Sequence, residues 1–208
     1  MLDAGLAPQR AVLTEPIVGW RTWTVAGSRD GSRARLLPIA GRGSWPARAP
    51  MRASCGKGRH HSVPGLTCSC GIHATRDPDL LRRTRDPAAL GRVALWGRVI
   101  EHEHGYRSEL GYPQRLTLIC PLCFWQWGLE RANPPDHVIR HRGGRMVPLC
   151  GPHLELAQRY GYPAPRILEP DIVERALLDR YAVDVLPSSL ERRRGAVPGR
   201  RGSGEPLA

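Results

Sequence analysis

Six cysteines constrain what this chain can fold into more than any other feature. They fall into two groups, Cys55–Cys70 and Cys120–Cys150. The first sixteen residues lack a basic region followed by an apolar core, so we expect no secretory signal and a cytoplasmic protein. In that compartment cysteines serve as free thiols or metal ligands more often than as disulfides. The sequence therefore predicts metal binding rather than a disulfide framework.

The second cysteine group has the spacing C-x2-C…C-x2-H. Its members are Cys120, Cys123, Cys150 and His153. A two-residue gap lets a tight turn bring both ligands of a pair to one ion, at about 2.3 Å for sulfur. Three thiolates and one imidazole make a complete tetrahedral set for Zn²⁺. The spacing therefore predicts a structural zinc site, the alternative being four unrelated residues.

The first cysteine group predicts a second zinc site. Cys55 is followed by His60 or His61, and then by Cys68 and Cys70. Residues i and i+2 lie on one side of an extended segment, so the last two thiols can share an ion. The spacing leaves open which histidine is the ligand, and small cysteines buried under a loop are the alternative. Two Zn²⁺ ions would help to stabilise a chain with 23 Gly and 20 Pro.

Strand-forming segments dominate the first 119 residues. Apolar and β-forming residues gather in five runs, at 17–26, 34–40, 70–75, 91–103 and 106–119. The last two runs flank a turn at His104-Gly105, and Pro113 predicts a bulge or an edge. Asp77 predicts the cap of a short helix. Short connections without a βαβ rhythm predict an α+β fold with a small, mostly antiparallel sheet or partly open β-barrel.

The remainder of the chain predicts a treble-clef-like zinc unit with C-terminal helices. After the first ligand pair, FWQWGL (124–129) predicts an extended piece, and a helix from Pro152 to Gly161 holds the last ligand in its first turn. Residues 169–183 predict an amphipathic helix. We divide the chain into a disordered tail (1–14), a β-rich domain with a zinc loop at 55–70 (15–119), a zinc-knuckle and helical unit (120–187) and a disordered basic tail (188–208).

The charge of the chain favours a polyanionic partner. Its 31 basic and 19 acidic residues give a formal net charge of +12. Residues 21–60 hold nine basic residues and one acidic residue, a net charge of +8. We therefore expect nucleic acid to contact this third of the chain, through Arg21, Arg33, Arg35 and Arg42. The pairs Trp20/Trp23 and Trp125/Trp127 could stack on bases, but apolar anchoring of a small core is the preferred interpretation.

The stretch EHEH (101–104) contains residue types found in catalytic and metal sites, but strand geometry argues against such a site. In a regular strand Glu101 and Glu103 point to one side and the two histidines to the other, so the four groups cannot converge on one ion. We interpret the stretch as a solvated hairpin end and keep His102 or Glu103, at the mouth of a small barrel, as a candidate lining residue of a binding site. The chain also lacks a P-loop, a nucleophile elbow and an apolar window long enough to span a membrane.

Two resemblances to known families add to these predictions. GWRTW, CSCGIHA and GRVALWGRVIEHEHGYRSELGYP resemble stretches of a group of uncharacterised actinobacterial proteins, over roughly residues 15–120. This resemblance implies no activity. More weakly, residues 120–153 resemble HNH nucleases, through the first cysteine pair, the DHVI and GG stretches and LC.

The second resemblance implies a possible catalytic site. In HNH nucleases the histidine of the DH pair activates water beside a divalent ion, so His137 and Asp136 are the matching candidates. The chain departs from the family, because Arg145 to Leu149 leaves no room for its middle Asn, and His153 stands where its second Cys would be.

Three functions therefore remain open at this point. The preferred one is a zinc-stabilised, non-catalytic binding protein that contacts nucleic acid. The alternatives are a metal-dependent hydrolase or degenerate HNH-type nuclease, centred on His137 or on the His102/His104 group, and an adaptor for a protein partner. No membrane is expected among the partners.

Overall fold

A computed structural model describes residues 15–40, 43–58, 61–162 and 166–187. Arg42, His60 and both predicted tails lie outside the described residues. The fold is α+β with a mostly antiparallel sheet, as predicted. No helix in the described part of the chain is long and apolar enough to cross a membrane.

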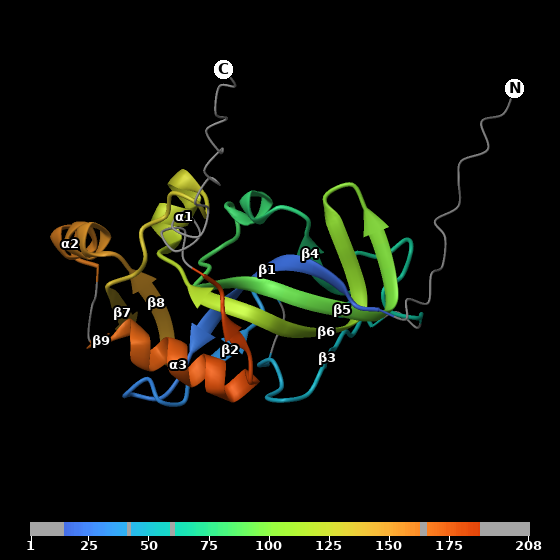
Figure 1. The fold of residues 1–208 in the computed structure, drawn as a ribbon, viewed down its shortest axis with the longest axis horizontal. Helices are drawn as coiled ribbons and strands as arrows, with labels where there is room; N and C mark the ends of the chain where they lie inside the picture. Colours follow the sequence, from blue (N-terminus) through green and yellow to red (C-terminus); the bar gives the residue numbers. More distant parts are fainter. Residues whose placement is uncertain (1–14, 41–42, 59–60, 163–165, 188–208) are drawn as a thin grey trace, which may run out of the picture.

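The elements follow one another as shown in Figure 1. In chain order they are β1 (Ile17–Ala26), β2 (Arg35–Leu37), β3 (Met51–Arg52), β4 (Ile72–Thr75), the 3-10 helix η1 (Pro78–Leu81), β5 (Ala89–His102), β6 (Gly105–Leu118), α1 (Pro121–Trp127), β7 (His137–Arg140), β8 (Arg145–Leu149), α2 (Gly151–Arg159), β9 (Ile167–Leu168), α3 (Pro170–Tyr181) and β10 (Asp184–Val185). Asp77 caps η1 as predicted, its side chain accepting a hydrogen bond from the Asp79 N–H.

The long antiparallel hairpin β5–β6 forms the centre of the sheet. Two register shifts interrupt it. One leaves Gln114 unpaired beside Pro113, where the sequence predicts a bulge. The other places Gly97 and Arg98 opposite Glu109, and Gly97 there adopts a φ of +71°, a left-handed conformation that favours glycine.

Strand β1 connects two parts of the sheet. Residues 17–23 pair with β5, and residues 24–26 pair with β2. On its other side, Val25 and Ala26 pair with β8. Strand β4 pairs with both β6 and β1, so the pairings of β1, β5, β6 and β4 close a ring. One sheet thus contains strands from both predicted domains. The division of the chain into two domains stays a prediction.

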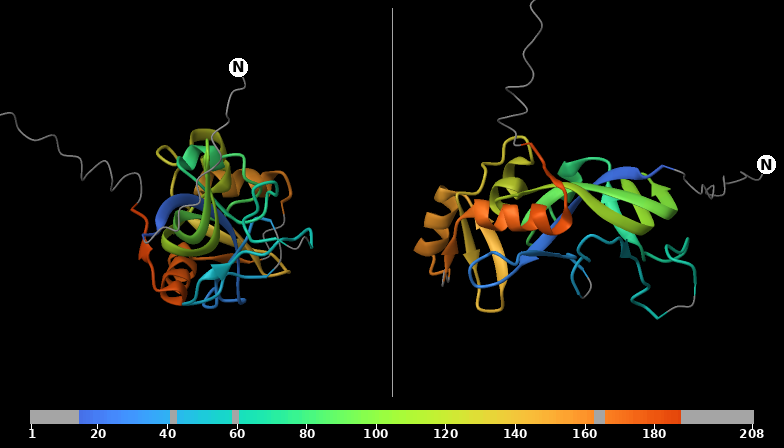
Figure 2. Two further views of the ribbon diagram at one scale, coloured as in Figure 1. Left: turned by 90° about the vertical axis from the view of Figure 1, so that its right-hand side faces the viewer. Right: turned by 60° about the horizontal axis from the view of Figure 1, so that its bottom comes forward.

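The main core lies between the sheet and α3. Trp23 and Trp45 are 0% and 1% exposed, and their rings meet edge to face with centroids 5.5 Å apart. Helix α3 lies along one side of the sheet (Figures 1 and 2) and buries Val173, Leu177 and Tyr181. The Tyr181 hydroxyl accepts a hydrogen bond from the Leu36 N–H at 3.0 Å and donates one to the Trp45 carbonyl at 3.2 Å.

The prediction that residues 124–129 are extended is wrong, because most of them belong to helix α1. Pro121 occupies the first turn of this helix, where its fixed φ suits a helix start. Gly128, with a φ of +73°, ends it by donating its N–H to the Phe124 carbonyl. Hairpin β7–β8, which the sequence did not predict, lies between α1 and α2 in the chain. Helices α2 and α3 confirm the two predicted helices.

Candidate metal centres and binding surfaces

The four residues predicted as the second metal site lie together at the starts of two helices. Cys120 precedes α1 and Cys123 lies in its first turn, while Cys150 and His153 hold the matching positions at α2. Their ligand atoms all lie within 4.8 Å of one another. We call this group the Cys120 cluster.

The spacing of these atoms fits one tetrahedral ion. The Nδ1 atom of His153 lies 3.3 Å from the Sγ atoms of Cys120 and Cys123 and 3.1 Å from that of Cys150. The Sγ atoms of Cys123 and Cys150 are 3.6 Å apart. Ligand atoms about 2.0–2.3 Å from a central ion lie about 3.3–3.8 Å apart in a tetrahedron. The Cys120 cluster can therefore hold a metal ion without large rearrangement.

Hairpin β7–β8 brings the second ligand pair to the first. Leu149 ends β8 and pairs with His137 of β7, so Cys150 follows directly from the sheet. The Asp136 carboxylate accepts a hydrogen bond from the Gly151 N–H at 2.7 Å, which satisfies one backbone donor at the start of α2. These contacts fix the direction in which α2 leaves the cluster.

Burial favours the protonated form of two thiols in the Cys120 cluster, those of Cys120 and Cys123. Its three cysteines are at most 1% exposed and pack against Ile139, Leu149 and Leu154. Burial raises the pKa of Cys120, and it raises the pKa of Cys123 to about 12. Metal binding here must therefore release thiol protons.

The residues predicted as the first metal site also lie together, with His61 as the histidine of the set. Ligand atoms of Cys55, His61, Cys68 and Cys70 lie within 4.8 Å of one another. The Sγ atoms of Cys55 and Cys68 are 3.8 Å apart, and the same distance separates Cys70 Sγ from His61 Nε2. We call this group the Cys55 cluster. It belongs to a loop rather than to helix termini.

Arg107 of β6, which the sequence analysis missed, anchors that loop to the sheet. Its Nη1 atom donates to the carbonyls of Gly65, Cys68 and Cys70. The sequence could not predict this contact, because Arg107 is far from Cys68 and Cys70 in the chain. Only the pairing of β4 with β6 brings them together. Bonded to the Cys70 backbone N–H, the Cys68 thiolate has its pKa lowered to about 6, whereas burial raises the pKa of Cys70.

Both clusters have the composition of structural metal sites. Each offers four protein ligands, which fill a tetrahedral ion and leave no position for water or substrate. A catalytic ion keeps such a position open. The geometry thus supports metal ions that hold the fold together.

The candidate catalytic residues do not gather around a third metal site. Within the described residues, neither group able to hold an ion includes Asp136, His137 or His102. His102 is exposed at the end of β5, and partial burial with nearby Arg107 lowers its pKa. The whole EHEH stretch is exposed, as expected for a solvated hairpin end, and Glu101 forms an ion pair with Arg76.

The candidate nucleic-acid contacts do not share one environment. Arg33 and Arg35 are exposed, in the β1–β2 loop and in β2. Arg21 instead extends from β1 over the ring of Trp45, at 5.3 Å from the ring centroid. The expectation of apolar anchoring holds for Trp23, which is fully buried.

The same expectation is wrong for the second tryptophan pair. Trp125 is 61% exposed and Trp127 is 50% exposed on the short helix α1. Their helix is held in place by Arg82, whose guanidinium donates to the carbonyls of Trp125 and Gln126.

An open apolar groove runs between α1 and α2. Its volume is about 690 Å³. Exposed apolar side chains line it, namely Leu122, Trp125, Leu156, Tyr160 and Tyr162. Trp127 does not line this groove but faces a separate one beside η1. We call the groove between the two helices the α1–α2 groove.

Comparison with known proteins adds no family to this description. No protein-family model, curated protein or solved structure matches the chain. The features that indicate a function are therefore the two metal clusters, the arginines and the grooves of this structure.

Proposed function

We propose that the protein is a zinc-stabilised, non-catalytic module that binds single-stranded nucleic acid in the α1–α2 groove. The observation that carries the proposal is the set of exposed aromatic rings that line this groove, with exposed arginines in the loop beside it. Zinc is the metal that best suits the two donor sets, because three thiolates and one imidazole are soft and borderline ligands in a tetrahedral arrangement.

The Cys120 cluster packs against Val147, Leu149 and Ala157, which also line the groove. Its order of elements is a ligand pair at α1, hairpin β7–β8 and a ligand pair at α2, which is the plan of a treble-clef-like unit. In this proposal the ion fixes α1 against α2 and thereby sets the width of the groove. The ring of strand pairings would likewise be the partly open barrel that the sequence predicts.

Exposed aromatic rings give the groove its affinity for bases. Tyr160 is 81% exposed, Trp125 61% and Tyr162 43%. Exposed apolar side chains that gather in one patch, as they do here, commonly mark a binding site. Stacking of one base on an aromatic ring contributes about 1–3 kcal/mol and tolerates any base, because every base has a π face.

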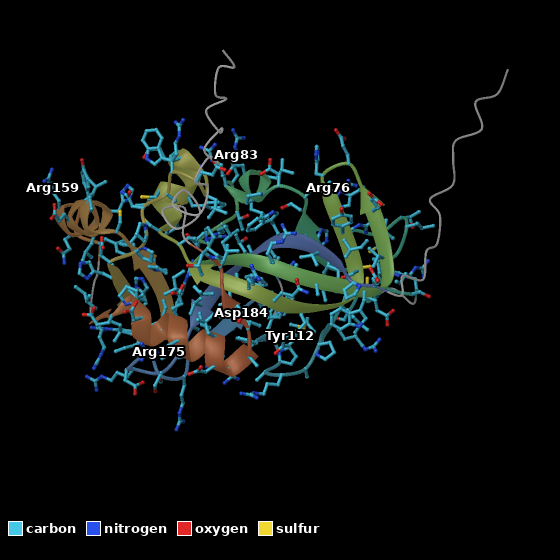
Figure 3. The ribbon with its side chains drawn as sticks, in the orientation of Figure 1. Arg76, Arg83, Tyr112, Arg159, Arg175 and Asp184 are labelled. Atoms are coloured by element: carbon cyan, nitrogen blue, oxygen red, sulfur yellow. The ribbon has the colours of Figure 1, made fainter. Side chains whose placement is uncertain are left out.

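Arginines around the groove supply charge for the phosphates. Arg82 lines it, and Arg83 and Arg85 follow in the same exposed loop. Arg83 and Arg159 project from the same upper side of the molecule as α1 and α2 (Figure 3). Asp86 is the acidic residue that lines this groove, and Arg145 pairs with it at 2.8 Å. The charge around the groove thus favours an anionic partner, and the aromatic rings favour nucleic acid among such partners.

Binding of a fluorescent oligonucleotide tests the proposal. We expect anisotropy to report binding of zinc-loaded protein to single-stranded oligonucleotides, with affinity that falls steeply as salt rises. Trp125→Ala should weaken binding by about tenfold or more, the loss of one stacking contact. Trp127→Ala is the matched control, because this neighbouring exposed tryptophan lies outside the groove. Equal effects of the two substitutions, or binding that salt does not weaken, would contradict the proposal and favour a protein-partner adaptor.

A metal-dependent hydrolase of degenerate HNH type is the second candidate. It is favoured by the position of His137 at the start of β7, next to Asp136 and paired with Leu149, the residue before Cys150 of the Cys120 cluster. Against it, the hydrogen bond from the Gly151 N–H already engages the Asp136 carboxylate. Plasmid cleavage with added Mg²⁺ tests it. Cleavage that disappears in His137→Ala would replace the binding proposal with this one.

A further inference from the structure

An arginine without an acidic partner lies against the main core. Arg21 belongs to the face of β1 that also presents Trp23 and Val25 to the core, and its guanidinium lies over the Trp45 ring. Its Nη1 atom donates to the His73 carbonyl. Its Nε atom is buried and has no acceptor.

Such an arrangement is costly for a structural arginine. Arg21 is half-buried, and within the described part of the chain no carboxylate pairs with it, although folded proteins normally pair a cation that is withdrawn from water. Burial lowers the pKa of Arg21 to about 10, so the side chain stays charged at neutral pH. The adjoining indoles of Trp23 and Trp45 also have buried N–H groups without acceptors. This part of the core therefore offers donors that no acceptor in the described chain satisfies.

Arg21 opens on a cavity of suitable size. The cavity has a volume of about 560 Å³ and lies between β1, β4 and the loop of the Cys55 cluster. Lys57 and His73 line it together with Arg21, and none of the described residues that line it is acidic. Hydroxyl groups also line it, from Thr22, Ser54, Ser69, Thr75 and Thr84. Pockets of about 300–1,000 Å³ commonly hold metabolite-sized ligands.

We propose that this cavity binds a phosphomonoester, with Arg21 as the residue that receives its phosphate group. The planar guanidinium can donate two parallel hydrogen bonds to an oxyanion. A phosphomonoester carries close to two negative charges at neutral pH, which Arg21 and Lys57 match. The surrounding hydroxyls can donate to the remaining phosphate oxygens. The phosphate belongs either to a free mononucleotide or similar metabolite, or to the end of a nucleic-acid strand.

The Cys55 cluster forms one wall of this cavity. Cys55, Cys68 and Cys70 line it, and Lys57 lies between the first two of them in the chain. An ion at the Cys55 cluster would hold this wall in place, so the site requires the metal-loaded protein. The cavity and the α1–α2 groove share Thr84 as a lining residue, but their aromatic and charged groups are different.

Calorimetric titration of the zinc-loaded, full-length protein tests the proposal. The probes are inorganic phosphate, AMP, and one oligonucleotide with either a 5′-phosphate or a 5′-hydroxyl. Saturable binding of phosphate and AMP supports a free phosphomonoester. Tighter binding of the 5′-phosphorylated strand alone supports a strand end. Binding of none of the phosphorylated probes above the hydroxyl control overturns the proposal.

Substitutions at Arg21 make the test specific. Arg21→Gln should weaken phosphate binding by about 10-fold to 100-fold, the effect of losing charge-assisted hydrogen bonds. Arg21→Lys keeps the cation but loses the fork, so it should weaken binding less; it carries the test if the glutamine variant does not fold. Arg115→Gln is the matched control, because Arg115 is exposed on β6 and lies outside the cavity. An unchanged affinity in Arg21→Lys, or an equal loss in Arg115→Gln, would overturn the proposal.

This site and the proposed function can fail separately. Phosphate binding is measured with mononucleotides and Arg21 variants, whereas groove binding is measured with 5′-hydroxyl oligonucleotides and the Trp125 variant. A protein that binds AMP but no oligonucleotide would refute the groove alone.

Discussion

The two metal clusters should differ sharply in how much stability depends on them. Cys123→Ser removes one ligand from the Cys120 cluster, and Cys68→Ser removes one from the Cys55 cluster. We expect each substitution to lower the zinc content from two ions per chain to one. Ser69→Ala, which changes a residue between two ligands without removing a thiol, should keep both ions.

The structure gives the expected magnitudes. The Cys120 cluster joins α1, β8 and α2, and its thiols are fully enclosed by apolar side chains. Zinc binding at such sites contributes about 10–16 kcal/mol, which is comparable to the whole stability of a domain, about 5–15 kcal/mol. Cys123→Ser should therefore leave residues 120–159 unfolded.

The Cys55 cluster closes a short loop instead. A disulfide that closes a loop of about 15 residues stabilises a fold by about 3 kcal/mol through the entropy of the unfolded chain, and a metal ion that closes the same loop restricts the unfolded chain in a similar way. Cys68→Ser should thus lower the free energy of unfolding by no more than about 3 kcal/mol. Arg107 and the pairing of β3 with β6 still tie this region to the sheet.

Elemental analysis gives the zinc content, urea unfolding gives the stability, and hydrogen exchange locates the loss. Cys123→Ser should lose protection across α1, β8 and α2, and Cys68→Ser only across residues 53–70. Two ions retained by either variant, or a larger loss of stability in Cys68→Ser than in Cys123→Ser, would refute the reasoning.

Three further predictions concern single residues. Tyr181→Phe should lower the free energy of unfolding by about 1–3 kcal/mol in urea, because two backbone groups lose their hydroxyl partner. Gly91→Ala should lower the free energy of unfolding several-fold more than a typical surface substitution, because a Cβ there would lie 2.0 Å from the Arg115 carbonyl oxygen. Thermal unfolding measures this loss of stability. Because the pKa of Cys123 is raised to about 12, zinc affinity of its cluster should rise about tenfold per pH unit for each thiol deprotonated; chelator competition between about pH 6 and 8 checks this sign.

The metal ligands could be predicted because their chemistry is local. Spacing alone brought Cys120 and Cys123 together, and the two-residue gap suits the first turn of a helix as well as a loop. The choice between His60 and His61 could not be predicted, because neighbouring residues in a loop can face either way. The set within the described residues uses His61.

The missed elements depend on contacts that are distant in sequence. The alternation of Trp125 and Trp127 is typical of a strand, but the segment forms a helix that begins at Pro121 and ends at Gly128. Strand β8 contains a proline and two basic or sulfur-containing residues, and it is completed by pairing with β1. The environment of Arg21 did have a signal, because it shares the parity of the buried tryptophan two residues later.

The double pairing of β1 also bears on how the chain is made. Ribosomes deliver β1 first, yet its partner residues on β8 follow roughly 120 residues later. The segment with the Cys55 cluster and the other strands that pair with β1, namely β2, β4 and β5, are all synthesised well before β8. We expect the nascent chain to load its first ion early and to keep the edge of β1 at Val25 and Ala26 unpaired until β8 has been synthesised, a stage at which chaperones would protect it from aggregation.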